Sequence, residues 1–354
     1  MFRLATLVVI ASSVAFAQAG NDRAAALAKN NATAQRSLKL INEKIATMKA
    51  GPLRDAVRAL VDAPRPSFMG RFADATARET ARLELINEGL LDASVTQEQL
   101  FPPMPATGAV QSFIGSSGSP VGKHHGYPGG LVEHTAFNLQ AALALEQLYK
   151  SQLETTLLDH DLIVAAPVLH DLMKTWTLQW NADGTTITQP KVGGTASHHP
   201  FIVAEALFRK FDPNVVIAIA GAHEPNGAPV IAYLRAGAIL AGVDPLAAKV
   251  LVKDAQGAWA LPQVVLPEAA LNHLSDHDYT LSDPAEGVTR DAIARLITAR
   301  AEEKKMKISE ADLRWEAHRV ETLAAGLKLY FVWVRGGDEA LSAELRRLKI
   351  TLLP

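Results

Sequence analysis

Apolar residues recur at three- and four-residue spacing through most of this 354-residue chain, and this helical period limits the folds it can adopt. Proline and glycine interrupt the pattern and divide it into segments of ordinary helix length. The segments are 22–50, 53–63, 73–91, 131–150, 161–175, 200–211, 213–222, 230–243, 319–334 and 338–348. We therefore expect an all-α protein, a helical bundle with further helical regions on both sides.

One short stretch departs from the helical period. Residues 176–180 alternate between large apolar and polar side chains, and residues 185–189 are rich in β-prone types. Between them, Asn181-Ala182-Asp183-Gly184 is typical of a turn. The sequence predicts a small β-hairpin inserted between two helices of the bundle.

The first residues resemble a targeting signal. A short positive start, Met1–Arg3, precedes the apolar run Leu4–Ala17 and two small-x-small cleavage patterns. We expect a signal peptide at residues 1–19 and a periplasmic or secreted bacterial protein; a buried amphipathic helix is the alternative interpretation. The run is shorter than the roughly 20 residues that span a membrane, and we expect no transmembrane segment after cleavage.

The remaining chain divides into three predicted parts. Residues 20–110 form an N-terminal helical region, residues 111–250 form the central domain, and residues 251–354 form a C-terminal helical region that packs on it. No internal repeat suggests a different division, and the sequence leaves the oligomeric state open.

The chain has no cysteine, which excludes disulfides, thiolate zinc sites and iron–sulfur clusters. Its formal net charge of −2 argues against an extended nucleic-acid-binding surface. Any metal site must therefore be built from imidazole and carboxylate groups.

The histidines are concentrated where such a site needs them. Eight of the eleven lie within 100 residues, namely His124, His125, His134, His160, His170, His198, His199 and His223. Several fall at the predicted ends of helices, as do Asp171 and Asp244, and ligands at helix ends can converge on one point in a bundle. Lys174 shares a helix face with His170, which suits a metal site that also binds an anion such as phosphate.

Two motifs in this region resemble a known family. The segment Lys123-His124-His125-Gly126-Tyr127-Pro128-Gly129-Gly130-Leu131-Val132-Glu133-His134-Thr135 is followed by Val168-Leu169-His170-Asp171-Leu172-Met173-Lys174. Together they resemble the HD superfamily of metal-dependent phosphohydrolases. The similarity is greatest to the branch found in bacterial exoribonucleases of the YhaM type and in some relaxases. The family order of ligands, His, His-Asp, His, His and Asp, is matched by His134, His170-Asp171, His199, His223 and Asp244.

The resemblance implies an HD-domain helical bundle that hydrolyses a phosphomonoester or phosphodiester with one or two divalent ions, Mn, Fe, Ni, Co, Mg or Zn. His134, His170, Asp171 and Asp244 would hold one ion, and His199 and His223 a second, with Asp171 bridging. Asp171 and Lys174 would be the catalytic residues, with Lys174 neutralising charge on the phosphate. His124, His125 and Lys174 would contact a small phosphorylated, nucleotide-like substrate.

Some assignments stay open on the sequence alone. His198 can replace His199 as the ligand, and Asp244 before Pro245 also fits a helix N-cap. The segment Asp276-His277-Asp278 suggests a metal site but has no identifiable partners. Two other functions remain possible: a non-catalytic metal- or nucleotide-binding module of the cell envelope, and an iron-dependent oxygenase on the same scaffold.

Overall fold

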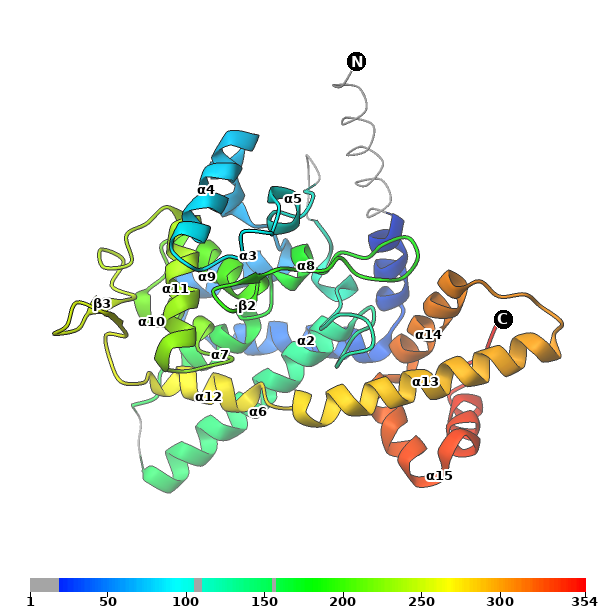
Figure 1. The fold of residues 1–354 in the computed structure, drawn as a ribbon. Helices are drawn as coiled ribbons and strands as arrows, with labels where there is room; N and C mark the ends of the chain where they lie inside the picture. The colour runs from blue at the N-terminus through cyan, green and yellow to red at the C-terminus, as the bar shows by residue number, and fades with distance from the viewer. Residues whose placement is uncertain (1–18, 105–109, 155–156) are drawn as a thin grey trace, which may run out of the picture.

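A computed structural model describes residues 19–104, 110–154 and 157–354, and the predicted signal peptide lies outside them except for residue 19. Helices make up nearly all of the regular secondary structure of the described chain (Figure 1), which confirms the predicted all-α class. A helix over residues 19–29 comes first. It is followed by α2 (Ala32–Ile45), α3 (Pro52–Asp62), η1 (Ser67–Phe72), α4 (Ala75–Asn87), α5 (Gln97–Leu100), η2 (Phe113–Gly115), α6 (Gly130–Leu153), α7 (His160–Leu169) and α8 (Lys174–Thr177).

The second half of the chain continues in the same way. Its elements are α9 (His198–Phe208), α10 (Pro213–Ala220), α11 (Gly227–Ala241), α12 (Pro267–Ser275), α13 (Tyr279–Glu303), α14 (Glu310–Ala324) and α15 (Gly326–Arg347). Two antiparallel strand pairs interrupt the helices: β1 (Lys191–Val192) with β2 (Thr195–Ala196), and β3 (Val252–Lys253) with β4 (Trp259–Ala260).

The main hydrophobic core surrounds α7, α9 and α10, whose middle turns are buried on all sides. Its members run from Ala34 in α2 to Ala269 in α12. The core therefore includes residues on both sides of positions 110 and 250, and the predicted division into three parts stays a prediction. A second core lies between α13, α14 and α15 and includes Ile293, Val320 and Leu341.

The C-terminal helices contact the rest of the molecule beside the loop that precedes α6. The Thr322 hydroxyl donates to the carbonyl of Pro128 at 2.9 Å. The indole of Trp315 donates to the carbonyl of Ala182 at 2.8 Å. In Figure 1, α13 extends away from the main bundle, and α14 and α15 lie beside it.

Three predicted elements differ from the structure. The helix expected over 22–50 is broken at Asn31, whose side chain caps α2 by accepting from Thr33 N at 2.8 Å. Residues 176 and 177 are helical, so the hairpin predicted over residues 176–189 is reduced to a bridge between Trp180 and Thr186. The β1–β2 ladder lies after this range. The helix expected over 319–334 is broken at Ala325, where the backbone turns to a φ of 64°.

Candidate metal centre

The loop before α6 and the first turns of that helix position His134. Gly130 begins α6, and a Cβ atom at this position would lie 1.9 Å from the carbonyl oxygen of His125, so only glycine fits. His134 follows one turn later and is 1% exposed. The motif of two glycines before the predicted ligand thus has a steric reason.

The turn after α7 positions His170 and Asp171. The backbone tightens there, with Lys174 N donating to the carbonyl of Asp171 at 2.9 Å. His170 Nδ1 lies 3.0 Å from the carbonyl of Pro167, which leaves Nε2 facing the interior of the site. Both residues are 1% exposed.

Asp171 faces two groups of imidazoles with its two carboxylate oxygens. Oδ2 lies 3.1 Å from His134 Nε2 and 3.5 Å from His170 Nε2. Oδ1 lies 3.1 Å from His198 Nε2 and 3.8 Å from His199 Nε2. The predicted ligands from the first turn of α9 and from the turn after α7 therefore lie together, and both His198 and His199 face the same oxygen.

A second buried carboxylate completes the first group. Asp276 Oδ1 lies 3.1 Å from His134 Nε2 and 3.3 Å from His170 Nε2. Its other oxygen lies 3.6 Å from His223 Nε2. Asn138, one turn after His134 in α6, donates to Asp276 Oδ1 at 2.7 Å.

Asp244 is not at the centre, and the structure corrects that prediction. It is exposed on the segment that follows α11, where its carboxylate accepts from Leu246 N at 2.9 Å. Its carboxylate closes a local turn with Leu246, and no helix begins at this position, so it is not the helix N-cap that the sequence also allowed. The residue that occupies the expected place is Asp276, in the turn between α12 and α13.

The β1–β2 ladder and the segment leading to it orient the α9 histidines. The Thr195 hydroxyl lies 2.7 Å from His199 Nδ1, and Gln189 Oε1 lies 2.7 Å from His198 Nδ1. Both histidines are thereby held with Nε2 facing Asp171. A partner on the second ring nitrogen is a typical feature of metal-ligating histidines, because it fixes the tautomer and the ring orientation.

Several ring nitrogens that face the centre lie near a carboxylate oxygen but make no hydrogen bond of good geometry. The buried atoms without a hydrogen bond include Nε2 of His170, His198, His199 and His223, and Oδ1 of Asp171. Leaving such atoms unpaired inside a protein costs free energy, so their convergence indicates a missing ligand. Groups of these residues bring one ligand atom each within 4.8 Å of the others, which is close enough to share a metal ion.

The protonation states suit a divalent cation. Burial lowers the pKa of His198 and of His223 to about 4, and holds that of His199 well below its usual value, so these rings are neutral near pH 7. Burial would raise the pKa of Asp171, but the charges of Lys174 and His170 keep it well below its usual range. Neutral imidazoles with ionised carboxylates are the ligand forms that metals bind.

His134 carries the opposite shift. Burial lowers its pKa, but the hydrogen bonds and charges of Asp171, Asp276 and Asp278 raise it well above its usual value. A protonated His134 therefore balances the carboxylates in the metal-free protein. A metal cation binding at Nε2 would take over that balance and displace the proton.

The remaining predicted site residues lie at the edge of the centre. The Lys174 ammonium is buried, 2.5 Å from Asp171 Oδ2 and 2.6 Å from the carbonyl of Gly118. His124 and His125 lie beside His134, with ring centroids 5.2 and 5.4 Å from it. Their roles in substrate contact and charge neutralisation stay predictions.

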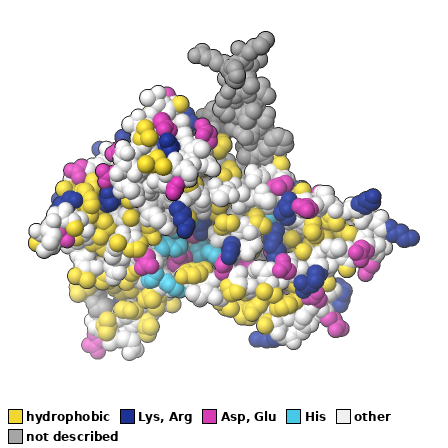
Figure 2. All heavy atoms as spheres, in the orientation of Figure 1, with side chains coloured by type: hydrophobic (Ala, Val, Ile, Leu, Met, Phe, Trp, Pro, Cys, Tyr) yellow, Lys and Arg dark blue, Asp and Glu magenta, His cyan; other side chains and the backbone are white. Residues whose placement is uncertain are grey.

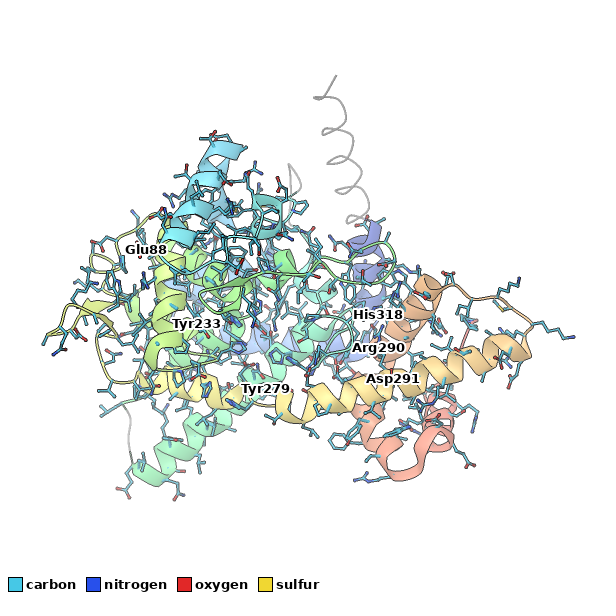
Figure 3. The ribbon with its side chains drawn as sticks, in the orientation of Figure 1. Glu88, Tyr233, Tyr279, Arg290, Asp291 and His318 are labelled. Carbon is cyan, nitrogen blue, oxygen red and sulfur yellow. The ribbon has the colours of Figure 1, made fainter. Side chains whose placement is uncertain are left out.

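Two tyrosines flank the cluster. Tyr233 of α11 has its ring centroid 6.1 Å from that of His199, and Tyr279 at the start of α13 lies 6.2 Å from His124 (Figure 3). Histidine side chains reach the surface between the main bundle and α13, where they are cyan in Figure 2. The side chain of His223 is 33% exposed, and Tyr279 is 39% exposed.

Comparison with known proteins adds one relative. The chain is 34% identical over 110 residues to the dihydroneopterin 2′,3′-cyclic phosphate phosphodiesterase of Methanocaldococcus jannaschii. The similarity covers 30% of this chain and 41% of the relative, so the chain spans about two fifths of the length of the curated protein that it matches. No protein-family model matches the chain, and no solved structure matches it significantly. Over part of its length, the chain is thus similar to a phosphodiesterase.

Proposed function

We propose that this protein is an HD-type, metal-dependent phosphoric ester hydrolase that acts on a small nucleotide-like phosphodiester or phosphomonoester. One observation carries the proposal: the two oxygens of Asp171 face separate sets of imidazoles, His134 and His170 on one side and His198 and His199 on the other. A carboxylate placed in this way can bridge two metal ions. The relative with phosphodiesterase activity supports the same chemistry.

Bound divalent ions would supply a water of lowered pKa and would bind the phosphoryl oxygens. The residues of the chain hold and orient these components. Asp276 keeps His134 and His170 facing Asp171, and Asn138 fixes Asp276 in turn. Lys174 adds a positive charge beside Asp171, where it would neutralise charge that develops on a bound phosphate.

The edge of the centre favours a substrate with a planar ring. Tyr279 is 39% exposed and lies against the rings of His124 and His277, with centroid separations of 6.2 and 5.4 Å. An exposed aromatic ring beside a phosphate-binding centre can stack on a heterocycle. The relative acts on the cyclic phosphate of a pterin. We therefore propose a phosphate ester of a planar heterocycle as the substrate class.

We also propose that the protein is exported to the periplasm or secreted. The apolar run 4–17 and the small residues after it support this location. A chain cleaved after residue 19 would keep the first described contacts, because Asn21 is 5% exposed and its side chain accepts from Trp180 N at 2.9 Å. Mass spectrometry of the protein from the periplasmic fraction would test this, and an intact residue 1 there would contradict it.

A substrate screen tests the enzymatic proposal. The full chain, loaded with Mn²⁺, Fe²⁺ or Co²⁺, is assayed on bis-p-nitrophenyl phosphate and on 2′,3′-cyclic nucleotides. We expect metal-dependent turnover that Asp171→Ala reduces to background, because both proposed metal positions lose their shared ligand. Asp254→Ala, the same change on the β3–β4 loop, is the control and should retain full activity. Equal turnover by the two variants would overturn the proposal.

A further inference from the structure

Helix α13 contacts the loop before α6 through two acidic side chains, Asp283 and Glu286. They are three residues apart in α13 and therefore lie on one face of the helix. His124 N donates to Asp283 Oδ1 at 2.9 Å, and His125 N donates to Glu286 Oε2. Lys123 Nζ lies 3.2 Å from Asp283 Oδ2. Asp283 and Glu286 thus hold three consecutive residues of the loop, and we call this pair the loop clamp.

The loop backbone at the clamp has a conformation that needs such support. His125 has a φ of 53°, a left-handed conformation that is uncommon for residues other than glycine. Its carbonyl accepts from Gly118 N at 2.9 Å, and its N–H donates to Glu286, which is only 3% exposed. A strained conformation persists where surrounding contacts fix it, and such strain is typical of functional positions. Glu286 is therefore one of the contacts that fix the orientation of His125.

The clamped loop reaches the metal centre in two ways. The rings of His124 and His125 lie beside that of His134, at centroid separations of 5.2 and 5.4 Å. The carbonyl of Gly118, whose N–H donates to the His125 carbonyl, accepts from Lys174 Nζ at 2.6 Å. The clamp residues come 159 and 161 positions after the loop residues that they hold, so the link connects the C-terminal helices to the edge of the centre.

We propose that Asp283 and Glu286 are positioning residues, which hold His124 and His125 in the orientation that binds the phosphorylated substrate. The inference rests on the proposed function, because the loop histidines would act on a substrate of the metal centre. The hydrogen bonds of the clamp go to the loop backbone, so its loss should weaken substrate binding and leave the metal ligands in place. Loss of binding that is equal in the ground state and the transition state raises KM without changing kcat. The same helix begins with Tyr279, so α13 would supply both the stacking ring and the clamp (Figure 3).

Steady-state kinetics of the Mn²⁺-loaded full chain on bis-p-nitrophenyl phosphate tests the positioning role. We expect Glu286→Ala to raise KM at least about tenfold and to lower kcat less than about threefold, because Lys174 keeps its ion pair with Asp171. Glu286→Gln keeps an oxygen that can accept from His125 N and should restore KM to within about twofold of wild type. Asp291→Ala, an exposed position about two turns farther along α13, is the control and should behave as wild type (Figure 3).

Asp283→Ala should also raise KM, and it decides the result if Glu286→Ala does not fold, because the Asp283 side chain is 30% exposed. Two further readouts accompany the kinetics: trypsin should cleave faster after Lys123 in both alanine variants, and their bound metal after desalting should equal that of wild type. An unchanged KM, an unchanged rate of cleavage or a loss of bound metal would overturn the positioning role and leave the proposed function intact. If the wild-type protein shows no metal-dependent turnover, the proposed function and this inference are both overturned.

Discussion

The assignment of Asp276, rather than Asp244, to the metal centre can be tested by one matched pair of variants. Asp276→Asn removes a negative charge that lies 3.1 and 3.3 Å from the nitrogens of His134 and His170. Asp244→Asn makes the same change on an exposed turn. Because both replacements keep the size of the side chain, a difference between them reports the position of the charge.

The expected magnitude follows from Coulomb's law. At roughly 3.3 Å and an effective dielectric constant of about 20, the lost attraction for one unit of cation charge is about 5 kcal/mol, an upper limit because the amide oxygen remains a dipolar ligand. This corresponds to an increase of up to about three and a half decades in the metal dissociation constant. Asp244→Asn should leave metal affinity unchanged and alter the free energy of unfolding by less than about 0.5 kcal/mol.

Competition with a chromophoric chelator measures both dissociation constants, starting from metal-free protein and Mn²⁺ or Co²⁺. Unfolding in urea, in the presence of a chelator, confirms that each variant is folded. A weakened metal affinity in Asp244→Asn together with an unchanged affinity in Asp276→Asn would refute the assignment.

Three further predictions concern the groups that support the centre. Thr195→Val removes the hydroxyl 2.7 Å from His199 Nδ1 and should weaken one metal equivalent about 10–100-fold, measured by the same chelator competition; unchanged affinity would mean that the tautomer is fixed by other groups. Burial raises the pKa of Glu133 to about 7, so its contribution to stability is lost as pH rises from its unfolded value of 4.5 through 7. Glu133→Gln, which cannot ionise, should therefore be more stable than wild type at pH 8 by up to about 3 kcal/mol, and urea unfolding with chelator present should show this difference shrinking toward pH 4.5; a constant difference across this range would contradict the shift. Gly130→Ala places a Cβ 1.9 Å from the carbonyl oxygen of His125 and should lower stability by more than about 2 kcal/mol, whereas Gly70→Ala, which meets no atom within 4 Å, should change it by less than about 0.5 kcal/mol in thermal unfolding.

The helices and most of the histidine cluster could be predicted from the sequence because both depend on local pattern. His134, His170 and Asp171 lie at helix ends, and the sequence period locates helix ends well enough to bring them together. The hairpin was less predictable. Trp176 alternates with polar neighbours, but it packs into the core from the short helix α8, its indole donating to the carbonyl of Pro102 at 3.1 Å.

The final carboxylate ligand could not be chosen by local pattern. Asp244 follows α11 in the expected order, but the segment after it leaves the centre and forms the β3–β4 pair before α12 returns. No periodicity shows whether Asp244 or Asp276 lies next to His134 in the folded chain. The signal in the sequence was the Asp276-His277-Asp278 segment, and its partners became identifiable only when α6, α7 and α12 were placed side by side.

The most direct test of the central claim is anomalous diffraction from crystals of the Mn²⁺-loaded protein. The claim is that Asp171 bridges two metal positions, so we expect two anomalous peaks, one beside each oxygen of its carboxylate. One peak should lie near His134, His170 and Asp276, and the other near His198, His199 and His223. A single peak at Asp171, or metal bound only away from it, would contradict the two-metal centre on which the proposed hydrolysis depends.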